Sequence, residues 1–243
     1  MKKWILPASL IFLFFISVFF FQTIADVFLQ FLPHKTIFIE RTSLPELALQ
    51  HIMLVVVSSL ISIIIALGIA ILTRIRETEK FQEFILSMAT FGQTIPTVAV
   101  LALLVPFLGY GMKPILFALF LYGVLPILRN TIEGFRSIPP EVSEAARAMG
   151  MTPWQVIWNV EIPLALPAIV AGIRTSVILN ISVATIGATV GVTGFGTLIV
   201  NGIRADDVLT LLKGAIPVCL LALAVDSIFA KLKILCYNLR HIE

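Results

Sequence analysis

The sequence is dominated by apolar stretches that are long enough to cross a lipid bilayer. A hydrocarbon core of about 30 Å needs about 20 helical residues, and tilting accommodates longer stretches. Only 13% of the residues are charged, about half the share in soluble domains. Six stretches fit: Trp4–Phe21, His51–Leu72, Phe84–Leu108, Pro114–Leu128, Leu164–Val190 and Leu209–Ala230. We therefore predict an all-α integral membrane protein with six transmembrane helices, forming a single transmembrane domain over residues 1–243.

The distribution of basic residues predicts the orientation of these spans. Cytoplasmic segments of membrane proteins carry an excess of Lys and Arg. With the N-terminus inside, 11 of the 17 Lys and Arg residues fall on the cytoplasmic side and five outside, while Arg174 lies within a span. Both termini are therefore expected in the cytoplasm. The first span is expected to stay as an uncleaved anchor, because Ile24-Ala25-Asp26 is a poor small-residue cleavage site.

One polar, helix-forming segment, Glu141–Pro163, interrupts the apolar pattern on the predicted cytoplasmic side. Pro140 suits the first turn of a helix, and Gly150 suits its left-handed termination. Thr152 followed three positions later by Gln155 is a capping box, which predicts the start of a second helix. The segment is therefore expected to form two short helices joined by a glycine turn, with Pro163 and Pro167 marking re-entry into the membrane.

Three interpretations fit a polar helical segment at this position: a plain connecting loop, a DNA-binding helix-turn-helix and a protein-docking element. Phosphate binding needs clustered Lys and Arg. The segment has one basic residue, Arg147, and three acidic residues, so nucleic acid is not an expected partner. The first helix has a narrow apolar face of Val142, Ala145, Ala146 and Met149. Its two alanines would let it enter a groove, and methionine is an adaptable contact residue, which favours protein docking.

The segment also resembles the EAA loop of ATP-binding-cassette (ABC) importer permeases. Glu144-Ala145-Ala146, then Gly150, then Val160, Ile162 and Pro163 follow the family spacing, with Val160 and Ile162 where Ile and Leu are usual. The resemblance implies the type I importer permease fold, with a coupling loop at 139–163 that docks on an ATP-binding subunit. The docking residues that it implies are Glu141, Glu144, Ala145, Ala146, Met149 and Gly150.

The chain has no GxxxxGK[ST] phosphate loop. It is therefore expected not to be an enzyme and to hold no cofactor, with ATP and Mg bound by a partner ATPase. The family implies two ATP-binding subunits, a second permease copy or paralogue, and an extracytoplasmic solute-binding protein. It also implies a multi-pass location among the lipids of the bacterial cytoplasmic (inner) membrane.

Further motifs resemble the osmoprotectant permeases for glycine betaine, carnitine and choline. These motifs are Gln93-Thr94-Ile95-Pro96, the segment from Leu121 to Leu128, Ala148–Thr152, Ala171–Arg174 and Ala184–Gly191. The match extends roughly from Ser58 to Pro217, within a permease core of about 51–230, whereas the first span, about 4–21, carries little of it. The implied function is uptake of such an osmoprotectant. A permease for an amino acid, taurine or nitrate is the alternative, and a secondary transporter is a more distant one.

Polar residues within the spans are candidates for the translocation pathway, because such groups tend to face the bundle interior or water. These candidates are Gln93, Thr94, Asn180, Ser182 and Thr185. Hydrogen bonding between helices is the alternative role for them. Pro96 is expected to break the third span, and Arg174 is expected to be paired. The glycines of 187–202 favour a broken helix or turn at the outer mouth.

Overall fold

A computed structural model describes residues 4–21, 42–75 and 79–240. Within these ranges the chain is nearly all helical and contains no strand, which confirms the predicted all-α class. The α-helices are α1 (Ile5–Phe19), α3 (Leu44–Ile75), α4 (Glu79–Thr94), α5 (Thr97–Leu108), α6 (Met112–Arg136), α7 (Pro140–Ala148), α8 (Pro153–Val156), α9 (Ile162–Ala184), α10 (Phe195–Ala205) and α11 (Val208–Arg240). A π-helical turn, Ile157–Glu161, joins α8 to α9, and a 3₁₀ helix, Thr185–Val190, follows α9.

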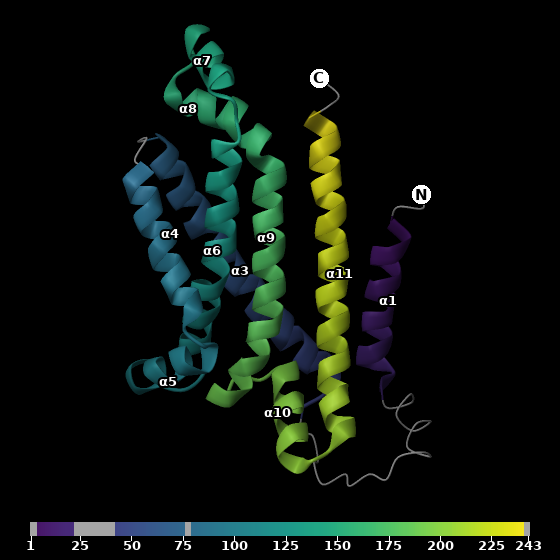
Figure 1. The fold of residues 1–243 in the computed structure, drawn as a ribbon. Coiled ribbons are helices and arrows are strands. Elements are labelled where there is room, and N and C mark those ends of the chain that lie inside the picture. Colours follow the sequence, from purple (N-terminus) through teal and green to yellow (C-terminus); the bar gives the residue numbers. More distant parts are fainter. Residues whose placement is uncertain (1–3, 22–41, 76–78, 241–243) are drawn as a thin grey trace.

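Four helical segments in the described part of the chain are long and apolar enough to cross a membrane: α3, α6, α11 and the continuous segment Pro153–Val190. The helices α4 and α5 make a fifth span only if they are taken together. The helix α1 is apolar but has 15 residues, fewer than the 20 or so of a typical span. Figure 1 shows α4, α6, α9, α11 and α1 side by side, with α3 crossing behind them.

The third predicted span, Phe84–Leu108, is not one straight helix. Its two halves, α4 and α5, meet at an angle of 94°. The break falls at Ile95 and Pro96, where Pro96 precedes α5 with an extended backbone. A residue before proline is disfavoured in the helical region, and proline cannot donate the helical hydrogen bond. The prediction that Pro96 breaks this span is confirmed.

The start of the fifth span also differs from the prediction. We expected a separate second helix in the polar segment, with re-entry into the membrane at Pro163. Instead the chain stays helical from Pro153 to Val190. The π-helical turn lets Ile162 N–H donate to the carbonyl of Ile157, and Pro163, which has no N–H to donate, follows directly after this turn at the start of α9. The second half of the polar segment, from Pro153 onward, is thus continuous with α9.

The packing of α6 against α9 depends on small residues at their seam. A Cβ added at Gly172 of α9 would lie 2.8 Å from the carbonyl oxygen of Pro126 and 3.0 Å from the Cα of Ile127. A Cβ added at Gly134 of α6 would lie 2.9 Å from the Cβ of Ala168. Membrane helices associate through such close backbone approaches, because lipid supplies no hydrophobic driving force between them.

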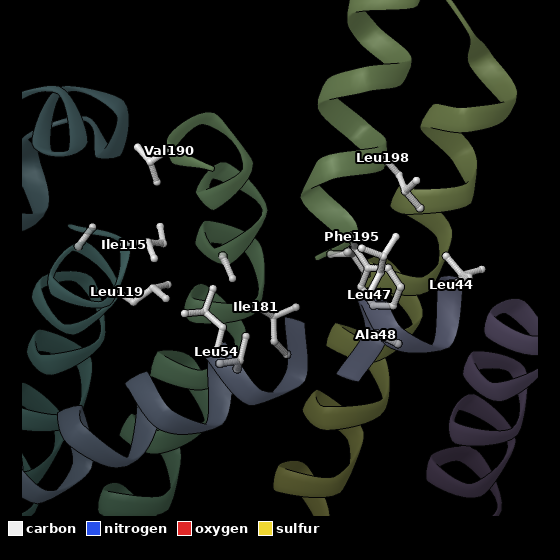
Figure 2. Packing of buried hydrophobic residues seen from close by; sticks show 14 of the residues in the cluster. Leu44, Leu47, Ala48, Leu54, Ile115, Leu119, Ile181, Val190, Phe195 and Leu198 are labelled. Atoms are coloured by element: carbon white, nitrogen blue, oxygen red, sulfur yellow. The ribbon is translucent and has the colours of Figure 1, made fainter. Parts of the chain in front are cut away.

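An apolar core forms around α10, at the end of the bundle away from α7 (Figure 1), and Figure 2 shows the packing of its side chains. It joins α3, α6, α9 and α10 through large buried side chains. Phe195, at the start of α10, is fully buried, and its ring contacts those of His51 and Phe14 at centroid distances of 5.3 and 6.3 Å. The glycine-rich segment makes this possible: Gly191 has a φ of 84°, so the chain turns between the 3₁₀ helix and α10. The broken helix predicted for this segment is confirmed.

The α6–α9 seam yields a prediction about stability. Gly172→Ala forces the backbone of α6 away and is expected to lower the free energy of unfolding by about 1–3 kcal/mol. Gly68→Ala on α3 is the control, because a Cβ there meets nothing within 4 Å. It should leave stability unchanged or raise it by up to about 1 kcal/mol. Equal effects of the two changes, measured by denaturant unfolding in detergent, would contradict the proposed close packing.

Candidate functional site

The segment between α6 and α9 projects from one end of the bundle as a structured loop (Figure 1). Its first helix, α7, starts with Pro140 and has Glu141 in its first turn, where an acidic group stabilises the helix dipole. Gly150 follows with a φ of 86°, which glycine adopts without strain. The hydroxyl of Thr152 accepts the Gln155 N–H at 3.3 Å, and Gln155 Oε1 accepts the Thr152 N–H at 2.8 Å. The predicted glycine turn and capping box are confirmed.

The predicted docking residues of this loop divide between exposed and buried positions. Glu141, Glu144, Ala145 and Gly150 are exposed, and Met149 is 72% exposed. Ala146 is only 2% exposed and faces the protein's own interior.

The predicted apolar face of α7 is therefore not a single outward face. Val142 packs against a second apolar core, which joins α3, α6 and α9 at the end of the bundle near the loop, and Ala146 is buried, while Ala145 and Met149 are exposed. A short helix lying on a bundle must bury one side, which sequence spacing alone does not assign. The outward surface is enlarged by Trp154 and Trp158, about half exposed, whose rings lie 5.6 Å apart.

Sequence reasoning missed a buried acid at the base of the loop. Glu161 is 2% exposed and lies in the last position of the π-helical turn. Its carboxylate accepts two hydrogen bonds from Arg74, at the end of α3, with distances of 2.8 and 2.9 Å. It also accepts a hydrogen bond of 2.8 Å from the hydroxyl of Ser143 on α7. The only sequence signal was an acid immediately before an apolar, proline-containing span.

The predicted pathway residues lie in two different places. Gln93 and Thr94 end α4, where Gln93 Nε2 donates to the carbonyl of Tyr122 on α6 at 2.6 Å. The hydroxyl of Tyr122 in turn donates to the carbonyl of Ile95, so α6 supports the break between α4 and α5. Thr94 is exposed.

The other three pathway candidates, Asn180, Ser182 and Thr185, belong to the fifth span. Asn180 is fully buried, and its Nδ2 donates to Ser59 Oγ of α3 at 3.1 Å, as expected of an interhelical contact. It belongs to a buried polar cluster that surrounds Gly123 of α6. Thr185 begins the 3₁₀ helix, and its hydroxyl donates to the carbonyl of the exposed Ser182.

Arg174 is paired, as predicted, although its partner was not anticipated. Its guanidinium makes two hydrogen bonds of 2.7 and 2.8 Å to Asp226 of α11. The pair joins α9 and α11 midway along both helices, where an unpaired charge would be costly.

These features define a class: a helical, multi-span membrane protein that presents one braced helical loop at one end of its bundle. Residues 58–233 match the family of the binding-protein-dependent transport system inner membrane component. The match covers more than half of the chain, so the protein belongs to this family of inner membrane permeases. The predicted family and inner-membrane location are confirmed.

Curated relatives and a solved structure agree with this assignment. The chain is 40% identical to the osmoprotectant import permease protein OsmW of Salmonella typhimurium over 79% of this chain and 90% of that protein. It is 42% identical to the carnitine transport permease protein OpuCB of Listeria monocytogenes, over 72% and 81% of the two chains.

A third relative is the glycine betaine/carnitine/choline transport system permease protein OpuCB of Bacillus subtilis. It is 39% identical over 74% of this chain and 82% of that protein. A chain of the MetNI methionine ABC transporter, in inward-facing conformations, matches with a TM-score of 0.69 over 77% of this chain and 93% of that chain. At 19% identity this likeness concerns the fold alone, and it confirms the predicted type I importer permease architecture.

Proposed function

We propose that this chain is the membrane-spanning subunit of an ATP-driven importer for an osmoprotectant such as glycine betaine, carnitine or choline. The substrate class is supported by a sequence identity of about 40%, over most of both chains, to permeases named for these solutes. Permeases for other small solutes share the fold, so the fold by itself does not select the substrate.

The loop built on α7 and α8 would be the site at which an ATP-binding subunit docks. Its outward surface combines the exposed Met149 with Trp154 and Trp158, flanked by the acidic Glu141 and Glu144. Aromatic and methionine side chains are enriched in protein interfaces. Two such subunits, binding ATP and Mg, would work with two permease chains and an extracytoplasmic solute-binding protein. This chain would carry out no covalent chemistry.

The continuity of the loop with α9 supports a mechanical role. The helix that starts at Pro153 runs without interruption to Val190, so a displacement of the docked loop acts directly on α9. Close packing at Gly172 and the Arg174–Asp226 pair would then carry α6 and α11 along with it. Such rigid-body movements are a recognised basis of switching between two states.

The solute pathway would be lined by hydroxyl groups that the single chain leaves exposed. Thr175 and Ser182 are both exposed and lie two helical turns apart on one face of α9, with Thr185 close to the second. Thr94 is exposed at the end of α4, next to Gln93. Neutral hydroxyl and amide groups suit a small zwitterion, which must be released as well as bound. Asn180, enclosed between α3 and α9, would brace the bundle.

The docking proposal is tested by changing the exposed residues of the loop. Glu144→Lys and Gly150→Asp are expected to reduce co-purification of the ATP-binding subunit at least tenfold, because a hot-spot change costs about 2 kcal/mol or more. Glu46→Lys, an exposed acid at the opposite end of α3, is the matched control and should retain the subunit. Unchanged co-purification in both loop variants would refute the docking role.

The substrate proposal needs a transport measurement. Proteoliposomes containing the complete importer should accumulate at least one of radiolabelled glycine betaine, carnitine or choline, and only when ATP is supplied on the side of the ATPase. Amino acids, taurine and nitrate serve as comparison solutes in the same vesicles. Transport of one of these comparison solutes, with none of the three osmoprotectants accepted, would overturn the assignment.

A further inference from the structure

We infer that Arg74, Glu161 and Ser143 form the joint through which the docking loop moves two transmembrane helices together. We refer to these three residues as the clasp. The inference rests on the proposed function, because it assigns positioning residues to the power stroke of that importer. Arg74 belongs to α3, Ser143 to α7, and Glu161 to the π-helical turn that leads into α9.

The geometry of the clasp distinguishes it from an ordinary surface ion pair. The guanidinium of Arg74 donates one hydrogen bond to each carboxylate oxygen of Glu161, and the two residues are 87 positions apart in the sequence. Paired hydrogen bonds of this kind fix orientation as well as distance. Arg129 and Glu133 provide the contrast within α6: they are neighbours on one helix, more than 60% exposed, and held by a single contact of 3.2 Å.

Ser143 turns the ion pair into a link between three elements. Its hydroxyl donates to Glu161 Oε1 at 2.8 Å, so one carboxylate holds α7 and α3 at once. Because Glu161 is 2% exposed, losing either partner would leave a buried charge incompletely satisfied. Movement of α7 therefore pulls on α3 and α9 through the same group.

Apolar packing does not fill the space between the loop and the end of α3, beside the clasp. A cavity of about 360 Å³ lies between them, lined by Ile75 of α3, by Met151 and Pro153 of the loop, and by the charged ends of the clasp. A π-helical turn is rare and often marks a functional position. Here it brings Glu161 to the edge of this cavity, within reach of both partners.

A second chain of polar contacts extends the joint to two more helices. Thr73, which precedes Arg74, accepts a hydrogen bond of 3.3 Å from Gln82 of α4. Gln82 in turn accepts one of 3.4 Å from Arg136, at the end of α6. The helix ends nearest to the loop are thus tied to one another beside the clasp. A force applied to α7 thus reaches the ends of four helices, α3, α4, α6 and α9, over a short distance.

The test compares Glu161→Gln with Glu133→Gln in the reconstituted importer, with phosphate release and uptake of radiolabelled glycine betaine measured in the same vesicles. Glu161→Gln should keep the ATP-binding subunit and its hydrolysis but lower the solute imported per ATP about tenfold, a typical coupling between sites. Glu133→Gln removes an equal charge from an exposed pair and should leave that ratio unchanged.

Further variants separate coupling from folding. Exchanging the charges, Arg74→Glu with Glu161→Arg, should restore much of the solute imported per ATP. If Glu161→Gln fails to reach the membrane, the milder Ser143→Ala decides, since it removes one hydrogen bond to Glu161 and keeps the ion pair with Arg74. An unchanged ratio in the folded variants overturns the clasp while leaving the proposed function intact. If no ATP-binding subunit co-purifies with the wild-type chain, the proposed function is refuted, and the clasp with it.

Discussion

The close contact between α6 and α9 is the interaction on which the rest of this structure depends. In lipid, helices gain nothing from burying apolar side chains against one another, so association requires close van der Waals packing and a few polar contacts. Gly172 and Gly134 bring the two helices together, and the loop that carries α7 connects these same two helices. The loop is consequently held at both ends by the best-packed pair in the bundle.

Polar groups reinforce this arrangement at three depths. The clasp lies at the base of the loop, the Arg174–Asp226 pair lies midway along α9 and α11, and Asn180 meets Ser59 between α9 and α3. All three involve the continuous helical segment that starts at Pro153. A charged or amide group within apolar surroundings is tolerated only with a partner, so each contact also restricts how its helices slide. The fifth span is therefore positioned to transmit movement from the loop to its neighbours.

Sequence reasoning succeeded where the controlling interaction is local. Pro96 breaks a helix by its own geometry, Gly150 supplies a left-handed turn, and the Thr152 capping box needs only a residue three positions away. It failed where the partner is distant or where tertiary packing decides. Nothing near Glu161 in the sequence indicates Arg74, and helical spacing does not say that Ala146 faces inward whereas Ala145 faces outward.

The central claim is that the surface around Met149 receives the subunit that powers transport. The most direct measurement places a photo-cross-linking amino acid at Met149 in the intact complex, with Phe107 as the comparison position. Phe107 is 86% exposed on α5, toward the opposite end of the bundle (Figure 1). The account predicts a cross-link from position 149 to the ATP-binding subunit and none from position 107. Cross-linking to that subunit from 107, or its absence from 149, would contradict it.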